Sequence, residues 1–265
     1  MAVTQKYLQG LKNRDALFAI ADYNIGEVSR YWRIRQINHI FRSMKITLPT
    51  QFNLYPSKQN VHNQKLSASP TVSVFHQVLN IPDCAYLIFK SRSHMKPADV
   101  IFPHGNIAGV SSNVSTNTST YLPFDMVDII SRYAELKIVG ETDENLTNSE
   151  PMSILHYAPG QYYRPHVDYF SPNIDVSAQL LADGGQRTVS TITYLTAPIE
   201  GGGTSFPRLN IQIPPIVGNT LWLKNCLGNG EPDPRSLHAG DPVGRGEKWV
   251  ITKWFREKPT QYLAN

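Results

Sequence analysis

Residues 153–168 read SILHYAPGQYYRPHVD, and this stretch decides which kind of fold the chain can adopt. It holds two short runs of strand-forming residues with a Pro-Gly turn signal between them. The second run ends on His166 and Asp168, which are separated by one residue. Side chains two residues apart in a strand point to the same face, so we expect these two polar groups to lie side by side.

Similar runs recur towards the C-terminus. Residues 188–197, 218–225 and 248–255 read TVSTITYLTA, GNTLWLKN and KWVITKWF, with turn residues between them. Many short strands with Gly- and Pro-rich turns favour an antiparallel barrel or a double-sheet jelly roll. We therefore predict an α+β, mainly β fold with a jelly-roll core (a double-stranded β-helix), flanking helices and an N-terminal helical extension.

The segments before this core are interpreted from their periodicity. Residues 72–78 have strand character, whereas 82–92 and 124–139 have the spacing of amphipathic helices. Residues 1–48 also carry helical periodicity. From Leu48 to Pro70 the chain is rich in Pro, Asn, Gln and Ser, which indicates a linker.

Composition excludes several classes of protein. With 41% apolar and 17% charged residues, the chain is neither disordered nor a coiled coil. The net charge of +4 is mild and the Lys and Arg residues are scattered, which argues against a nucleic-acid partner. Cys84 and Cys226 are too few for a disulfide scaffold. Because there is no signal-peptide core and no run of about 18 apolar residues, we expect a cytoplasmic protein without a membrane partner.

His166 and Asp168 together offer an imidazole and a carboxylate to one metal ion. A third ligand must come from elsewhere, and His238 in the segment SLHAGDPV is the natural candidate. Two His and one carboxylate on one face of an octahedron leave three positions open, as in non-haem Fe(II) oxygenases. Lys248 follows His238 by ten residues, in GEKWVITKWF, and puts a cation on a following strand.

Five segments resemble the prolyl 4-hydroxylase family of 2-oxoglutarate dioxygenases. They are YAPGQYYRPHVDYF, GGQRTVSTITYLT, EGGGTSFP, LHAGDPV and GEKWVITKW, in the family's order and at similar spacing. The resemblance covers residues 72–258 and is strong from Ser153 onward. It implies an enzyme that hydroxylates an unactivated C–H bond while 2-oxoglutarate and O2 become succinate and CO2. Fe(II) and 2-oxoglutarate are the implied cofactors, and the resemblance leaves open whether ascorbate is a third.

The resemblance also divides the chain. Residues 71–258 form the expected dioxygenase domain, 1–70 an N-terminal helical extension with a linker, and 259–265 a C-terminal tail. The apolar faces of the N-terminal helices are expected to pack on this domain or to join copies of the chain into an oligomer.

Carried over position by position, the resemblance makes His166, Asp168 and His238 the iron ligands. Lys248 pairs with the distal carboxylate of 2-oxoglutarate. The hydroxyls of Tyr157 and Thr204 donate hydrogen bonds to the cosubstrate carboxylates, and Tyr194 lines the same pocket.

The implied substrate contacts are Tyr163, Arg187 and Trp254, under a mobile lid formed by residues 103–120. Two departures from the family bear on the substrate. Ser112, Asn113 and Ser115 stand where peptide hydroxylases often have a basic lid residue, and Arg256 stands where some members have His.

Four functions therefore remain open from the sequence. The first is hydroxylation of a prolyl residue in a peptide or protein, and the second keeps the chemistry but acts on a free amino acid or small metabolite. The third is a non-catalytic binding module that kept the fold, although no ligand or cation of the site is missing. The fourth is demethylation of a nucleic acid, which would require a basic groove and an Arg at the position of Lys248.

Overall fold

The computed structural model describes residues 62–98, 100–101, 107–108, 115–122, 127–171 and 177–261. The predicted N-terminal helices, with the oligomer contact assigned to them, lie outside these residues. Within them, no helix has both the length and the apolar character needed to cross a membrane.

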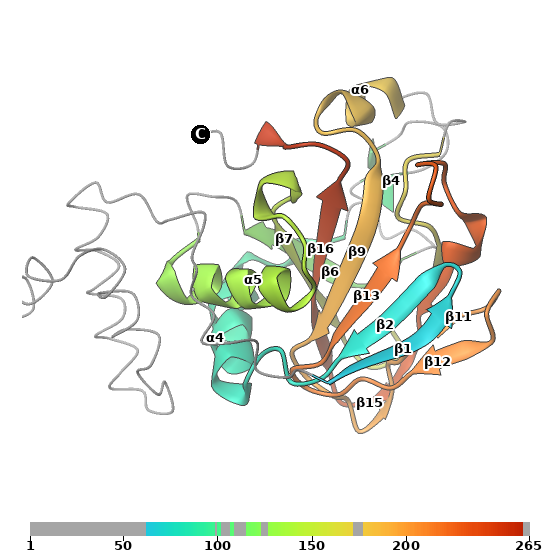
Figure 1. The fold of residues 1–265 in the computed structure, drawn as a ribbon. Helices are drawn as coiled ribbons and strands as arrows, with labels where there is room; N and C mark the ends of the chain where they lie inside the picture. Colours follow the sequence, from blue (N-terminus) through green and yellow to red (C-terminus); the bar gives the residue numbers. More distant parts are fainter. Residues whose placement is uncertain are drawn as a thin grey trace, which may run out of the picture.

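A large antiparallel sheet forms the centre of the molecule (Figure 1). Its strands do not follow the sequence, because neighbouring strands come from distant segments. In spatial order they are β1 (Asn63–Ala68), β2 (Thr71–Phe75), β13 (Thr220–Lys224), β9 (Arg187–Tyr194), β16 (Lys248–Arg256), β7 (Met152–Tyr157), β6 (Thr118–Leu122) and β3 (Lys96–Pro97).

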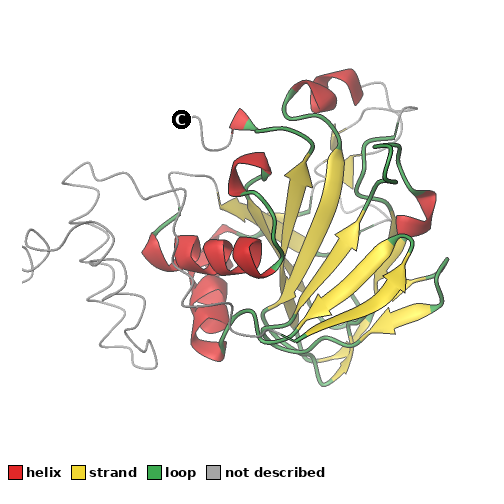
Figure 2. Cartoon of the chain, viewed as in Figure 1, coloured by secondary structure: helices red, strands yellow, loops and turns green. Residues whose placement is uncertain are grey.

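A smaller antiparallel sheet of four strands completes the core. Its order is β12 (Ile211–Ile213), β11 (Thr204–Phe206), β14 (His238–Gly240) and β8 (Tyr163–His166). Two short pairs lie outside both sheets: β10 (Glu200–Gly201) with β15 (Val243–Arg245), and β4 (Val100–Ile101) with β5 (Ile107–Ala108). Two antiparallel sheets built from many short strands are the predicted jelly-roll core, and mainly β content is confirmed (Figure 2).

Helices α4 (Ile81–Ser91) and α5 (Ile129–Glu141) lie beside the larger sheet, and α6 (Ser177–Ala182) is one short turn further along the chain (Figure 1). Asn80 caps α4, since its side chain accepts the N–H of Asp83 at 2.8 Å. Asp128 caps α5 in the same way, with the Ser131 N–H at 2.9 Å. The cap explains why this helix begins at Ile129, later than periodicity predicted. Among the described residues, 3-10 turns span Arg92–His94, Leu146–Asn148 and Pro234–Ser236.

Strand β16 is buried on both faces and therefore separates two apolar clusters. Val250 packs with Tyr157, Tyr194 and other residues in the cluster between the sheets. On the opposite face, Trp249 and Ile251 pack against α4 and α5. A central strand covered on both sides has no solvent face, which is why the run KWVITKWF shows little apolar–polar alternation.

The predicted linker is wrong over residues 63–68, because these form β1 and pair with β2. Its composition is polar because β1 is an edge strand with mostly exposed side chains, and only Leu66 packs against the core. The predicted tail also contains a buried residue: the Thr260 hydroxyl donates to the Ser149 carbonyl at 2.8 Å.

Candidate active site

A cavity of about 480 Å³ opens between the two sheets. Strands β16, β7, β6 and β9 of the larger sheet line one side, and β8, β14 and β11 of the smaller sheet line the other. Nine of the ten residues predicted for the site line this cavity: Tyr157, Tyr163, His166, Asp168, Arg187, Thr204, His238, Lys248 and Trp254. The missing one is Tyr194.

Three potential metal ligands converge in this cavity. One ligand atom from each of His166, Asp168 and His238 lies within 4.8 Å of the others. The Nε2 atom of His166 is 3.5 Å from Oδ1 of Asp168, and Nε2 of His238 is 3.6 Å from Oδ2. His166 and His238 face each other across the β8–β14 pairing. Asp168 lies just past the end of β8 rather than within the strand, so the loop that follows β8 turns it towards the histidines.

Backbone carbonyls orient both imidazoles. Nδ1 of His166 is 2.9 Å from the carbonyl of Arg164, and Nδ1 of His238 is 3.0 Å from that of Ser236. A carbonyl only accepts, so each Nδ1 carries the proton and each Nε2 keeps its lone pair for a metal. The ring of Tyr163 stacks on His166 with centroids 3.6 Å apart, which fixes the plane of that imidazole.

The protonation states also suit a metal. Burial and the nearby His238 lower the pKa of His166 to about 4, so its imidazole is neutral at neutral pH. Burial alone would raise the pKa of Asp168, but His238, His166 and a hydrogen bond from Ser190 outweigh it and lower this pKa to about 2. A neutral imidazole at His166 beside an ionised carboxylate at Asp168 fits the donor set of Fe(II).

Lys248 lies at one end of the cavity. Its side chain is 2% exposed, and Nζ donates to the carbonyl of Gly203 at 3.0 Å. Burial lowers the pKa of this amine to about 8. A Cβ at Gly240 would lie 3.6 Å from the hydroxyl of Tyr157 and 3.7 Å from Nζ of Lys248. The absence of a side chain at Gly240 therefore leaves space beside two converging donors, which suits a carboxylate.

Tyr194 is absent from the lining of the cavity, and its role in the cosubstrate pocket stays a prediction. It is fully buried in the apolar cluster between the sheets, and its hydroxyl donates to Oγ1 of Thr204 at 2.7 Å. Because Thr204 accepts this bond, its own hydroxyl proton is directed elsewhere. Tyr194 thus acts behind Thr204, which does reach the cavity.

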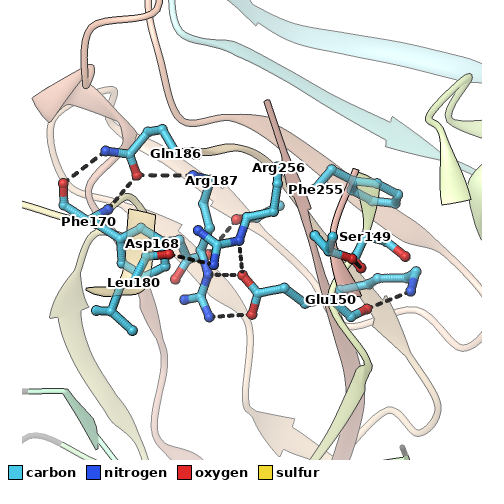
Figure 3. Close-up of polar contacts among 12 residues, drawn as sticks. Ser149, Glu150, Asp168, Phe170, Leu180, Gln186, Arg187, Phe255 and Arg256 are labelled. Carbon is cyan, nitrogen blue, oxygen red and sulfur yellow. Dashed lines mark hydrogen bonds and ion pairs between the residues drawn. The ribbon is translucent and has the colours of Figure 1, made fainter. Parts of the chain in front are cut away.

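Arg187 and Trp254 lie at the other end. The Nε and Nη2 atoms of Arg187 each lie 2.6 Å from a carboxylate oxygen of Glu150 (Figure 3). The guanidinium stacks 3.9 Å from the ring of Trp254 and 4.9 Å from that of Phe170. Arg187 therefore lines the cavity while its guanidinium is paired with Glu150.

A second arginine shares the same acid. Nε of Arg256 lies 2.9 Å from Oε1 of Glu150, and its Nη2 donates to the carbonyl of Leu180 at 3.0 Å (Figure 3). Gln186 joins this network to the loop after Asp168: it accepts the N–H of Phe170 at 2.6 Å and donates to the carbonyl of Phe170 at 2.9 Å. The network braces the substrate end of the cavity, and Arg256 itself does not line it.

Part of the predicted lid is wrong as well. Residues 118–120 belong to β6, which pairs with β7 inside the larger sheet. Ser115 is buried, bridges to Tyr163 and lines the cavity. Residues 103–106 and 109–114 of the lid lie outside the described residues.

Sequence reasoning missed Glu150, Gln186 and Ser190, which contact the site residues from behind. Ser190 gave a usable signal, because it alternates with Ile192 on the inward face of β9 and is polar where an apolar residue is expected. Glu150 and Gln186 gave none, since each reaches the site through a side-chain hydrogen bond to a residue distant in the sequence.

Two His and one carboxylate in a jelly roll define the class of this protein: a non-haem Fe(II) oxygenase. The model of the 2OG-Fe(II) oxygenase superfamily matches residues 152–256, the segment that contains all three ligands. Prolyl 4-hydroxylase 1 of Arabidopsis thaliana is 32% identical over 215 residues, covering 76% of this chain and 74% of that protein. Probable prolyl 4-hydroxylase 3 of the same plant is 32% identical over 209 residues, covering 72% and 70%.

The chain therefore belongs to the prolyl 4-hydroxylase family of 2-oxoglutarate-dependent dioxygenases, and Fe(II) and 2-oxoglutarate are its cofactors. Solved structures support the same fold. The viral collagen prolyl hydroxylase of Paramecium Bursaria Chlorella virus-1, in its 2-oxoglutarate complex, matches with a TM-score of 0.53 at 23% identity, covering 70% of this chain and 95% of that one. A prolyl hydroxylase of Trichoplax adhaerens matches with a TM-score of 0.52 at 14% identity, covering 87% and 94%.

Proposed function

We propose that this dioxygenase hydroxylates a prolyl residue in a peptide or protein. In this proposal His166, Asp168 and His238 hold Fe(II), and Lys248, Tyr157 and Thr204 bind 2-oxoglutarate. The observation that carries it is the convergence of the three ligand atoms within 4.8 Å in the wall of a cavity that continues on both sides of them.

The length of the cavity favours a peptide over a single amino acid. Lys248, Val250, Thr252 and Trp254 of β16 all line it. These positions span six residue steps, or about 20 Å at the rise of a strand. With the cosubstrate at the Lys248 end, the part towards Trp254 still has room for an extended chain.

The state of Arg187 favours a peptide as well. A free amino acid would bring a carboxylate that needs an unpaired cation. The two-point pairing with Glu150 already occupies the Nε and Nη2 donors of Arg187 that a carboxylate would need. The remaining face of the guanidinium stacks on Trp254 and suits a neutral partner such as an amide carbonyl.

Bound Fe(II) supplies the oxidising chemistry, in which 2-oxoglutarate and O2 give succinate, CO2 and the hydroxylated substrate. The chain's own groups position the reactants. Lys248 and Tyr157 fix one end of the cosubstrate, and Tyr163 and Trp254 hold the substrate beside the metal. The largely buried walls restrict water at the reacting centre.

Succinate formation and product mass test this proposal. The chain is supplied with Fe(II) and 2-oxoglutarate, and proline-rich peptides and free amino acids are offered in turn, each with and without ascorbate. We expect succinate to accompany a mass gain of one oxygen on a prolyl residue of the peptide. Coupled turnover with free proline or lysine alone would show that the substrate is a free amino acid. Comparing succinate formation with and without ascorbate shows whether the enzyme requires it.

A further inference from the structure

A chain of polar side chains runs from Asp168 into the interior of the larger sheet. Oγ of Ser190 lies 2.6 Å from Oδ2 of Asp168, and Nδ2 of Asn225 lies 2.8 Å from Oγ of Ser190. Ser190 and Asn225 are both completely buried, and neither lines the cavity. They can therefore act on the reaction only through Asp168.

The direction of both hydrogen bonds follows from chemistry. A carboxylate that binds a metal is ionised and only accepts hydrogen bonds. Ser190 must then donate its single hydroxyl proton to Asp168, which leaves Oγ to accept from Asn225. Asn225 in turn must present its amide N–H and not its carbonyl. The three groups thus have one consistent arrangement of protons.

The backbone holds Asn225 in place for this role. Its N–H donates to the carbonyl of Thr188 at 2.7 Å, and its carbonyl accepts from the N–H of Asp233 at 2.9 Å. Its side-chain Oδ1 is buried and has no hydrogen-bond partner among the described residues. An unsatisfied buried acceptor costs stability, so packing alone gives no reason for an amide at this position.

We propose that Ser190 and Asn225 are positioning residues of the metal centre, which hold Asp168 through Oδ2 and leave Oδ1 for the metal. Oδ1 lies 3.5 Å from Nε2 of His166 and Oδ2 lies 3.6 Å from Nε2 of His238, so the hydrogen bond from Ser190 to Oδ2 is what distinguishes the two oxygens. A carboxylate restrained in this way offers one oxygen rather than two, so three coordination positions stay open for the cosubstrate and O2. This inference rests on the proposed function, because it takes Asp168 as a metal ligand.

Binding of Mn(II) by the whole chain without O2 tests the inference, with calorimetry for affinity and electron paramagnetic resonance for the bound ion. Ser190→Ala is expected to weaken binding about 10- to 100-fold and to change the spectrum, as loss of a ligand's hydrogen-bond partner does. Thr193→Ala is the matched control, because it removes a buried hydroxyl from the opposite face of β9, where Thr193 pairs with Thr220 at 2.8 Å. The control should bind Mn(II) like the unaltered chain.

Asn225→Ala tests the second step. Without the amide, the Ser190 hydroxyl can turn away from Asp168, so binding should weaken in the same direction but by less than in Ser190→Ala. The double variant should bind like Ser190→Ala alone, because Asn225 acts only through Ser190. Losses that simply add would overturn the two-step arrangement.

Asp168→Ala separates the failure of this inference from failure of the proposed metal site. Unchanged Mn(II) binding in Asp168→Ala would show that the metal site itself is wrong. If Asp168→Ala loses Mn(II) binding, the metal site is supported. If Ser190→Ala then binds Mn(II) as tightly as Thr193→Ala does, the positioning role is overturned. If Ser190→Ala does not fold, Asn225→Ala decides: weaker Mn(II) binding at an unchanged unfolding midpoint supports the role, and unchanged binding overturns it.

Discussion

Three residues shape the Lys248 end of the cavity: two donate hydrogen bonds, and the third leaves space for a ligand beside them. Lys248 supplies a buried cation and Tyr157 a hydroxyl, while Gly240 contributes by having no side chain. The two donors could be assigned from spacing and from the family resemblance. Gly240 could not, because its role depends on where strands β14, β7 and β16 bring their backbones together.

Gly240→Ala should weaken 2-oxoglutarate binding. The added methyl would contact the Tyr157 hydroxyl and Nζ of Lys248 at 3.6 and 3.7 Å, so the fold tolerates it but the cosubstrate carboxylate loses its space. Overpacking of this kind costs about 1–3 kcal/mol, so we expect the Kd to rise about 5- to 150-fold. Calorimetry with Mn(II) present measures it. Gly228→Ala is the control, since a Cβ there meets nothing within 4 Å; equal Kd values in the two variants would refute the assignment.

Lys248 should make cosubstrate binding depend on pH. Burial lowers its pKa to about 8, so the free protein loses this positive charge as the pH rises through that value. An anionic ligand favours the charged amine, so the Kd should rise about tenfold between pH of about 7 and about 9, and binding at the higher pH should take up a proton. Lys248→Arg keeps its charge throughout and should remove the dependence. A flat profile for the unaltered chain would contradict this expectation.

Among the elements, the buried strands could be predicted from their apolar runs, whereas the edge strand β1 could not. The strands around SILHYA, TVSTITYLTA, GNTLWLKN and KWVITKWF are confirmed as β7, β9, β13 and β16. Their apolar runs reflect burial in the sheet, which sequence records directly. Strand β1 was missed because an edge strand keeps polar side chains, and Glu150 was missed because it meets Arg187 only through tertiary pairing.

The loop after β8 should depend on Gln186 for its stability. Gln186 pairs with both the N–H and the carbonyl of Phe170, in the manner of a neighbouring strand. Gln186→Ala would leave two buried backbone groups unpaired, which should lower the free energy of unfolding by about 2–4 kcal/mol. Urea unfolding measures this. Gln212→Ala, which removes one exposed side-chain bond to Asp241, should cost under about 0.5 kcal/mol; similar losses in both variants would count against a bracing role.

Over the whole molecule, the site exists because strand order differs from sequence order. The larger sheet places β9 between β13 and β16, and the smaller sheet places β14 beside β8. His238 thereby meets His166 across 72 positions of the chain. The HxD motif and the downstream Lys248 could be recognised from sequence, but the polar residues behind them required this three-dimensional order.

The boundary of the folded domain follows from the same sheet and gives a last prediction. Sequence composition placed it at residue 71, whereas β1 pairs with β2 from residue 63 onward. A variant lacking residues 1–70 should be less stable than one lacking residues 1–61, because it loses the ladder of β1 and the packing of Leu66. Several backbone hydrogen bonds at about 0.5–1.5 kcal/mol each make a difference above about 2 kcal/mol.

The shorter variant should also associate. Removing β1 turns β2 into an edge strand whose backbone groups are unpaired and whose side chains Val72 and Val74 are buried in the native sheet. Such an edge is a template for pairing with another chain. Urea unfolding and size-exclusion chromatography compare the two truncated chains directly, and any contribution of residues 1–61 is absent from both. If both truncated chains have the same free energy of unfolding and both are monodisperse, the domain boundary lies at residue 71 and the fold does not require β1.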